Sequence, residues 1–221
     1  MQHLITVLSL LMLITFAQSQ TSPVPVEQEP HHRTLLKNDS VLVLRVNLAP
    51  GESTHYHTHV HDRAAIDLAA NTIRQQKLGE QETPPAISKP GEVAAYTLDG
   101  PYTHRVENVG SSPMDLIDIE FLQRPKQPAG AAASDVAAEN LSARAYRWVL
   151  APGAVSVMHS HERPYLIVAA TGMQLKMTAP DGSSFTHEVK PGDFHWIDSP
   201  VTHSLANLGS SPGEIVEFEL K

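Results

Sequence analysis

The sequence contains one series of short motifs twice, and this duplication constrains the fold more than any other feature. LAPG followed by HxH occurs at 48–59 and again at 150–161. THRVENVGSSP at 103–113 corresponds to THSLANLGSSP at 202–212. The motifs keep their order and nearly their spacing. Two repeats of about 80 residues predict a duplicated domain, because solenoids need at least about three shorter units.

The regions outside the repeats predict how the chain is divided. An apolar run at 4–17, followed by the small-x-small sequence Ala17-Gln18-Ser19, is typical of a cleaved signal peptide; an uncleaved anchor is the alternative. The run is shorter than the roughly 20 residues that span a membrane. We therefore expect a signal peptide at 1–19, an extended leader at 20–37, a first domain at 38–122, a Pro/Ala-rich linker at 123–139 and a second domain at 140–221. The mature chain would then be periplasmic or secreted.

Composition excludes several classes of partner and ligand. The net charge is -8 and no basic cluster is visible, which argues against binding to nucleic acid or, beyond the signal peptide, to a membrane. Cysteine is absent, so disulfides, thiolate metal ligands and a thiol nucleophile are excluded. Histidine occurs 13 times, and a bound metal would need His, Asp or Glu ligands.

Each repeat predicts an all-β domain. Short runs such as VLVLRVNL and EIVEFEL are rich in β-branched and aromatic residues, and Pro-Gly and Asp-Gly turns separate them. Many short strands favour a sandwich or barrel. Asp118 and Glu120 in the first repeat, like Glu217 and Glu219 in the second, alternate with apolar residues. This alternation predicts a solvated strand face. His31 and His32, in the leader, are expected to be solvated too.

The repeated motifs resemble the two-part pattern of the cupin superfamily, G-x5-HxH, then PG, then H-x3-N. Each copy supplies every part: Gly51, His57, His59, Pro90-Gly91, His104 and Asn108 in the first, and Gly153, His159, His161, Pro191-Gly192, His203 and Asn207 in the second. The resemblance implies a bicupin, with two tandem jelly-roll (RmlC-like) barrels. Each barrel is expected to contain a pocket for a metal or a ligand.

The histidine spacing has a physical meaning. Residues i and i+2 of a strand share one face about 6.6 Å apart, so both imidazoles can reach one ion. A third histidine from a neighbouring strand completes the set. The resemblance implies metal ligands at His57, His59 and His104, and at His159, His161 and His203. Neutral imidazole suits Fe, Zn, Ni or Cu, and Mn is a further candidate.

The first repeat leaves the ligand pair open, because histidines stand at 55, 57, 59 and 61. Counting from Gly51 selects His57 and His59, whereas alignment of HDR with HER selects His59 and His61. A shift of two residues preserves the strand face, so both choices point inward. The interval after the glycine is equal in the two repeats for His57, which favours the first choice.

One family feature is missing from both repeats. Metal-binding cupins usually have a glutamate four or five residues after the second histidine of HxH. The sequence has Arg63 and Ala64 there in the first repeat, and Tyr165 and Leu166 in the second. Three-histidine metal centres, pockets that have lost the metal and bind an organic ligand, and histidines that only pack in a barrel core all remain open. Tyr165 could donate a hydrogen bond near the site or fill the core, and His195 could face the second pocket or the surface.

These features predict a secreted bicupin that binds a divalent metal. A metal-dependent, oxygenase-type enzyme for a small organic molecule is one hypothesis. A non-enzymatic module that binds a small molecule, a carbohydrate or a metal is the alternative, and a scaffolding role is the third. A homodimer is compatible with the sequence. Fold does not fix the reaction.

Overall fold

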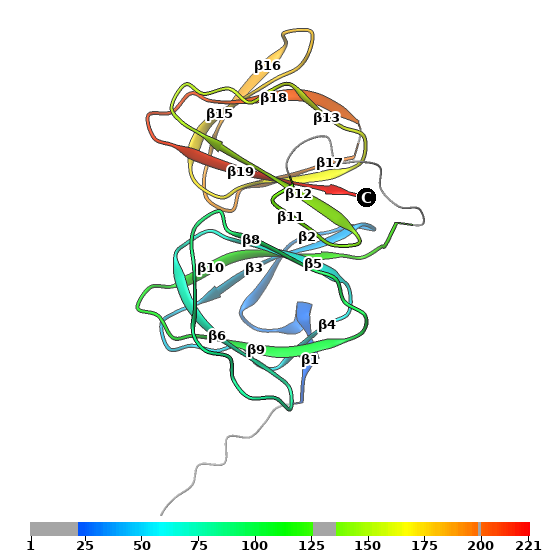
Figure 1. The fold of residues 1–221 in the computed structure, drawn as a ribbon, viewed down its shortest axis with the longest axis vertical. Helices are drawn as coiled ribbons and strands as arrows, with labels where there is room; N and C mark the ends of the chain where they lie inside the picture. Colours follow the sequence, from blue (N-terminus) through cyan, green and yellow to red (C-terminus); the bar gives the residue numbers. More distant parts are fainter. Residues whose placement is uncertain (1–21, 126–135, 199) are drawn as a thin grey trace, which may run out of the picture.

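A computed structural model describes residues 22–125, 136–198 and 200–221. Nearly all regular structure in these residues is β, and Figure 1 shows two barrels, one above the other. The predicted signal peptide and most of the predicted linker lie outside the described residues. Within the described residues, no helix is both long and apolar enough to cross a membrane. Among the described residues there is a single 3-10 turn, η1 (Val26–Gln28).

The first barrel consists of two five-stranded sheets. The first sheet has the order β1 (Val24–Pro25), β4 (His57–His59), β9 (Tyr102–Asn108), β6 (Asn71–Lys77) and β7 (Ala86–Ser88). The second sheet has the order β2 (His32–Lys37), β3 (Val41–Leu48), β10 (Met114–Phe121), β5 (Asp62–Asp67) and β8 (Val93–Tyr96). β1 pairs with β4 in parallel, and the other pairs are antiparallel.

The second barrel repeats this topology. One sheet has the order β11 (Ala138–Glu139), β12 (Ala143–Leu150), β19 (Gly213–Leu220), β14 (Tyr165–Ala169) and β17 (Phe194–Ile197). The other has four strands, in the order β13 (His159–His161), β18 (Val201–Asn207), β15 (Met173–Thr178) and β16 (Ser184–Val189). The tandem all-β barrels are those that the repeated motifs predict.

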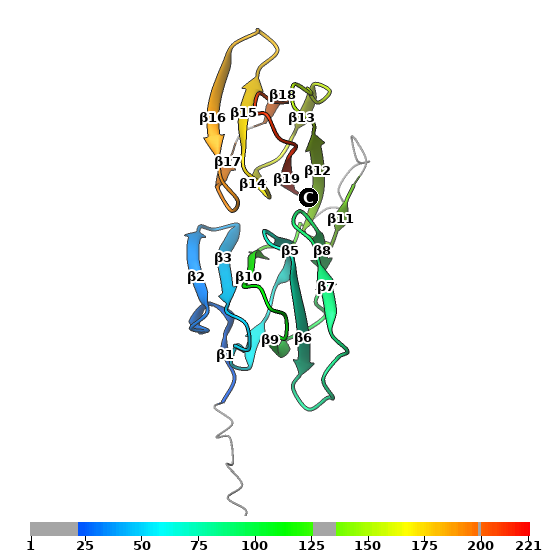
Figure 2. The ribbon, with the colours of Figure 1, turned by 90° about the vertical axis from the view of Figure 1, so that its left-hand side faces the viewer.

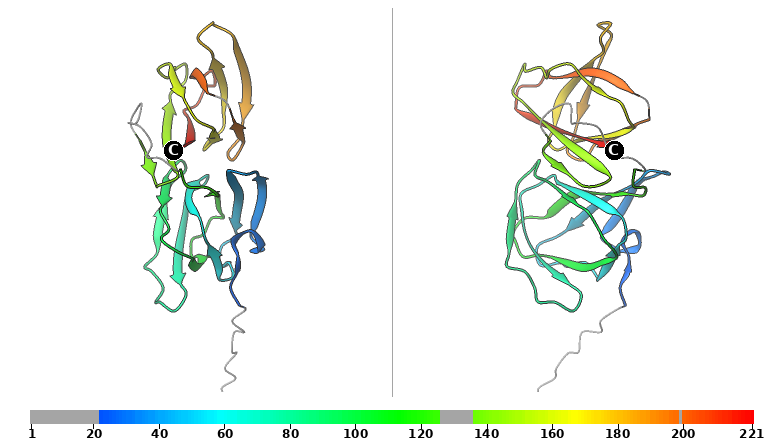
Figure 3. Two further views of the ribbon diagram at one scale, coloured as in Figure 1. Left: turned by 90° about the vertical axis from the view of Figure 1, so that its right-hand side faces the viewer. Right: turned by 45° about the vertical axis from the view of Figure 1, so that its right-hand side comes forward.

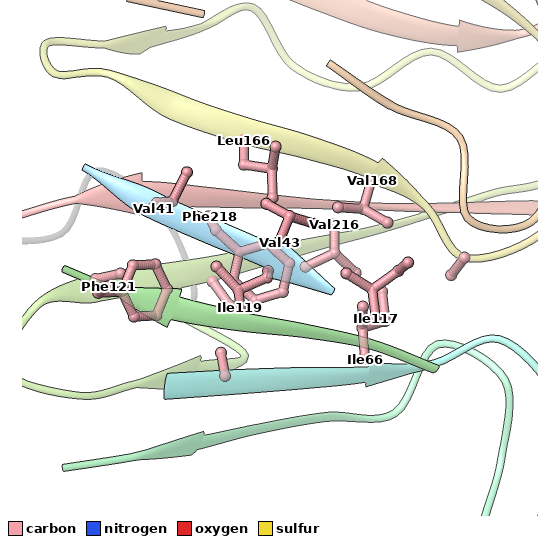
Figure 4. Packing of buried hydrophobic residues seen from close by; sticks show 14 of the residues in the cluster. Val41, Val43, Ile66, Ile117, Ile119, Phe121, Leu166, Val168, Val216 and Phe218 are labelled. Atoms are coloured by element: carbon pink, nitrogen blue, oxygen red, sulfur yellow. The ribbon is translucent and has the colours of Figure 1, made fainter. Parts of the chain in front are cut away.

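An apolar layer joins the two barrels. The sheet that contains β3 and β10 faces the sheet that contains β12 and β19, and their side chains form one buried cluster (Figures 1, 2 and 4). Ile119 of the first barrel and Phe218 of the second are among the side chains almost completely removed from solvent. Burial of each such side chain is worth about 1.5–3 kcal/mol. Two further views show the same stacking (Figure 3).

The interface corrects the prediction of a solvated acidic face. β10 and β19 are covered on both sides, by the other barrel and by their own barrel interior. Ile117 and Ile119 face the other barrel, so the alternating Asp118 and Glu120 face the inside of their own barrel, where both are buried. Glu217 is likewise completely buried. Alternation of apolar and acidic residues therefore marks an apolar interface on one side and a polar barrel interior on the other.

The predicted leader is also part of the first barrel. His32–Lys37 forms β2 and pairs with β3, and Val24–Pro25 pairs with the edge of β4. Proline is tolerated in such edge strands, which is why a Pro-rich segment can still complete a sheet. Val26 is buried, and the side chain of His32 is only 3% exposed. The first barrel therefore begins earlier than residue 38, and the prediction that His32 is solvated was wrong.

The two Pro-Gly turns hold the barrels close together. Gly91 and Gly192 have φ of 77° and 86°, a conformation that side chains with a Cβ rarely adopt. A Cβ on Gly192 would lie 2.9 Å from Leu68 Cδ1 of the first barrel, and one on Gly91 would collide with Glu214 of the second. Each turn thus packs against the opposite barrel.

Candidate metal centres in the two barrels

The strand pairing brings the six predicted histidines together as two sets of three. His57 lies directly opposite His104 in the pair β4–β9, and His159 lies opposite His203 in the pair β13–β18. The second histidine of each HxH shares the same strand face. The two clusters that result are His57, His59 and His104 in the first barrel and His159, His161 and His203 in the second. Whether they bind metal stays a prediction.

The first cluster is closely packed and oriented. His57 Nδ1 donates to the backbone oxygen of His55 at 3.0 Å, and His104 Nδ1 donates to Gln75 Oε1 at 3.2 Å. His59 Nδ1 is hydrogen-bonded with Glu120 Oε1 at 2.7 Å. The partners on Nδ1 of His57 and His104 leave their Nε2 atoms as unprotonated ligand atoms, as in most metal-binding histidines. His61 lies outside this cluster.

Burial keeps these imidazoles neutral. It lowers the pKa of His57 to about 3, with a further contribution from His32. It lowers the pKa of His104 to about 2, with a further contribution from the Arg63 guanidinium. The pKa of His59 is lowered by the same two causes. All three are therefore in the form that a metal requires, although a buried positive charge lies nearby.

That charge is Arg63, at the position where the family has its glutamate. Arg63 Nη1 lies 2.9 Å from Asp118 Oδ1, and both side chains are buried. Burial, with the charge of Asp118, raises the pKa of Glu120 to about 9. Asp118 is thus paired with an arginine, and Glu120, whose carboxyl stays protonated at neutral pH, lies behind His59.

The second cluster includes a carboxylate. Glu217 of β19 reaches all three histidines: its Oε2 is 3.0 Å from His159 Nε2 and 3.4 Å from His161 Nε2, and its Oε1 is 3.0 Å from His203 Nε2. The four ligand atoms lie within 4.8 Å of one another. Trp148 Nε1 donates to Glu217 Oε2 at 2.6 Å and so fixes the carboxylate from behind.

These distances fit a metal ion. Two ligand atoms at right angles, each about 2.1 Å from an ion, are about 3.0 Å apart. His159 Nε2 and His203 Nε2 are 2.9 Å apart, and His159 Nδ1 already donates to the backbone oxygen of Val157. Neither ring nitrogen of His161 has a hydrogen-bond partner among the described residues, although the side chain is buried. Closely spaced lone pairs and unpartnered buried nitrogens are what a cation at the centre would satisfy.

Charge in the second cluster differs from that in the first. Burial by itself would lower the pKa of His161, but Glu217 and Glu219 outweigh it and raise that pKa to about 9. Burial would raise the pKa of Glu217, but its contacts with the three histidines hold the value well below the usual range. Without metal, the ionised Glu217 therefore lies beside a protonated His161, and a metal ion would bind there with release of the His161 proton.

Glu217 is the site residue that the sequence reasoning missed. The family's glutamate follows HxH on the same strand, and a search at that position finds Tyr165 instead. Tyr165 stacks on His161, with ring centroids 4.0 Å apart and an interplanar angle of 18°. The acidic alternation in EIVEFEL is equally typical of a surface strand, so it does not by itself mark Glu217 as a site residue.

The two barrels also differ in their cavities. The first encloses about 210 Å³, with His57, Arg63 and Gln75 in its lining. The second has a cavity of about 800 Å³, lined mainly by apolar side chains. His195 lies in the lining of this larger cavity and is exposed, so it faces the second pocket at its mouth.

Comparison with known proteins agrees with this fold. The Cupin domain family model matches residues 146–219, which is most of the second barrel. AerE from Microcystis aeruginosa is similar over 90% of this chain and 98% of its own, with a TM-score of 0.62 and 14% identity. YhaK from Escherichia coli is similar over 86% of this chain and 93% of its own, with a TM-score of 0.62 and 13% identity.

A third structure is an oxalate decarboxylase from Bacillus subtilis, studied for its Mn(II) centres. It is similar over 82% of this chain and 69% of its own, with a TM-score of 0.54 and 12% identity. Identities this low indicate a shared fold and nothing more specific. No curated protein matches this chain by sequence.

Proposed function

We propose that the second of the two cupin-fold barrels is the active centre of a metal-dependent enzyme for a small organic molecule. The proposed ligands of the divalent metal are His159, His161, His203 and Glu217. The observation that carries this proposal is the convergence of three Nε2 atoms and one carboxylate within 4.8 Å. The adjacent cavity of about 800 Å³ gives room for a substrate.

The donor set narrows the choice of metal. Three imidazoles suit Fe, Zn, Ni and Cu, and a carboxylate adds Mn, which prefers oxygen ligands. Ligand atoms about 3 Å apart match neighbouring positions of an octahedron, which four ligands would leave with two free positions. We propose Mn(II) or Fe(II). The Mn(II) centres of the Bacillus subtilis oxalate decarboxylase, a protein of similar fold, support a metal of this class.

The residues around the cluster have separate tasks. Val157 and Trp148 orient His159 and Glu217 through hydrogen bonds of 3.0 Å and 2.6 Å. The Trp148 ring also stacks on His159, with centroids 4.4 Å apart. A bound metal would supply Lewis-acid or redox chemistry at its free positions. The chain's own contribution is a rigid, largely buried set of ligands beside an apolar space.

The first barrel is proposed as the weaker metal site. Its three histidines are neutral and oriented, but the carboxylate equivalent to Glu217 is Asp118, which is bound to Arg63. The buried guanidinium opposes the approach of a cation, whereas Glu217 attracts one. A metal in the first barrel would therefore have three imidazole ligands and no carboxylate ligand.

Metal analysis of paired double variants tests the proposal. The purified chain, reconstituted with Mn(II) or Fe(II), is expected to hold about one tightly bound ion, because Glu217 attracts a cation in the second barrel and Arg63 opposes one in the first. His159→Ala/His203→Ala should lose it, and the matched pair His57→Ala/His104→Ala should retain it. Circular dichroism confirms that both variants fold. No tight metal in the wild type, or loss only in the first-barrel pair, would contradict the proposal.

Location and assembly are further proposals. We propose that the mature chain is periplasmic or secreted, supported by the apolar run at 4–17. A mature N-terminus at Met1 would contradict this.

A homodimer is proposed as well, and sedimentation of the purified chain tests it.

A further inference from the structure

The cavity of the second barrel differs in chemistry from its counterpart in the first. Residues at equivalent places of the strand pairing can be compared directly. Gln75 of β6 corresponds to Met177 of β15, because they face Val106 and Leu205 at the same step of the pairing. Tyr96 of the first barrel likewise corresponds to Ile197 of the second, opposite Arg63 and Tyr165.

These exchanges make the second cavity more apolar beside its cluster, while Arg33, Arg45 and Asp193 line it elsewhere. Polar Gln75, Tyr96 and Asp67 line the first cavity, and Met177, Ile197 and Ala169 line the second. Leu175, Val201 and Ile215 extend the apolar lining of the second. A cavity of about 800 Å³ with such walls has the size and character of a site for a drug-sized organic molecule.

The apolar cavity borders the histidine cluster. Val201 is two residues before His203 on β18, and Ile215 is two residues before Glu217 on β19, so each pair shares a strand face. A molecule in the cavity would therefore have one end beside the cluster.

One polar group in this cavity has no partner. Tyr165 lines the cavity, its side chain is 0% exposed, and its hydroxyl makes no hydrogen bond with any described residue. A buried hydroxyl without a partner is unfavourable, because no hydrogen bond offsets the loss of its contacts with water. The Tyr165 ring stacks on His161, which places the tyrosine between the apolar cavity and the cluster. A polar atom on a ligand would satisfy the hydroxyl.

We propose that the second barrel binds a predominantly apolar organic molecule of the size of one or two aromatic rings, with one polar group hydrogen-bonded to the Tyr165 hydroxyl. Binding in the cavity is independent of the proposed function. Only the position of the polar group beside a metal rests on it. Phe185, 52% exposed, and His195 lie at the mouth of the cavity. Leu35 of the first barrel also lines it, so both barrels shape the entrance.

The probe for the test is 2-naphthol, an aromatic molecule with one hydroxyl, titrated into the full chain by calorimetry. Leu175→Trp fills the cavity and should weaken binding at least tenfold. Ile73→Trp is the matched control, because Ile73 and Leu175 lie opposite Asn108 and Asn207 in the two barrels. Binding to this control should equal binding to the wild type.

Tyr165→Phe tests the polar contact separately. It should weaken 2-naphthol binding by a factor of about 2 to 12, the range for one hydrogen bond, and leave naphthalene binding unchanged. If Leu175→Trp does not fold, the comparison of Tyr165→Phe with the wild type tests the proposed binding site. Equal affinity of wild type and Tyr165→Phe for 2-naphthol would overturn the polar contact.

Metal content, measured on the same samples, separates the two proposals. Metal in the wild type without 2-naphthol binding overturns the present inference alone, as does binding that Leu175→Trp leaves unchanged. Binding that Leu175→Trp blocks, in a wild type that holds no metal after reconstitution, supports the cavity assignment and contradicts the proposed function.

Discussion

Glu217 occupies in the second barrel the place that Asp118 occupies in the first. Each lies on the last strand of its barrel and faces the interior. Asp118 Oδ1 is 2.9 Å from the Arg63 guanidinium, whereas Glu217 Oε1 is 3.0 Å from His203 Nε2. Asp118 is paired with the permanent charge of a guanidinium, whereas Glu217 lies among imidazoles, where a metal ion can take the place of a proton. This difference leads us to expect unequal metal affinity.

Removing the charge of Glu217 should weaken the second site. Glu217→Gln keeps the size of the side chain but removes a full charge among three imidazoles, so metal affinity should fall at least tenfold. Competition with a fluorescent chelator measures it. Glu214→Gln, on the same strand but paired with Arg147 outside the cluster, is the matched control and should bind as the wild type does. Equal affinity in both variants would show that Glu217 is not a ligand.

Removing Arg63 should strengthen the first site at a cost in stability. Arg63→Met leaves Asp118 buried and unpaired, which should lower the free energy of unfolding by about 3–5 kcal/mol without metal. The freed carboxylate should then raise metal affinity in the first barrel. Metal binding and urea unfolding measure the two effects.

The control for this substitution is Arg45→Met, because Arg45 pairs with Asp115 away from both clusters. Arg45→Met should change neither the affinity for metal nor the barrel in which the metal binds. If Arg63→Met bound no more metal than Arg45→Met, the role assigned to Arg63 would be wrong.

The interface between the barrels should couple their unfolding. Phe218→Ala leaves a cavity in the shared apolar cluster, so the free energy of unfolding should fall by about 3–5 kcal/mol. Both barrels should unfold in one transition, which calorimetry detects. Val149→Ala, at a side chain 58% exposed, should have almost no effect. Two separate transitions in the wild type would contradict the coupling.

Acid should weaken the polar contacts at the edge of this interface. Burial alone would raise the pKa of Asp62, but hydrogen bonds from Arg124, the Leu98 amide and Ser142 together hold it below the usual value. A carboxylate whose pKa is lowered by folding stabilises the fold above its unfolded pKa of about 3.9. That stabilisation is lost as the pH falls through the lower folded value.

Asp62→Asn tests this effect. At neutral pH the variant should be about 2 kcal/mol less stable, since bonds to a charged group are lost. The difference should stay constant above about pH 5 and shrink below about pH 4. Urea unfolding at a series of pH values measures it. A difference that does not change with pH would show that the charge of Asp62 contributes nothing.

The duplicated motifs were sufficient to predict the fold and which histidines come together. Spacing of i and i+2 places His57 and His59 on one face whatever lies around them, so local sequence determines that part. Glu217 could not be assigned in the same way. Its alternation with apolar residues fits a surface strand equally well, and only the packing of the second barrel on the first makes both faces of β19 buried. The same long-range packing hid the burial of Asp118.

His32 was misplaced for a related reason. A Pro-rich, polar segment is extended in solution and in an edge strand alike, and its sequence does not reveal the sheet edge that it joins. The side chain packs against His57, with ring centroids 4.6 Å apart, through a contact between β2 and β4. Such contacts depend on barrel closure.

The most direct test of the second-barrel centre is a crystal structure of the Mn(II)-loaded chain with anomalous data at the manganese edge. Our account predicts the strongest anomalous peak in the second barrel, within about 2.0–2.3 Å of the Nε2 atoms of His159, His161 and His203 and of a Glu217 oxygen. A strongest peak in the first barrel, or a second-barrel peak without Glu217 as a ligand, would contradict it.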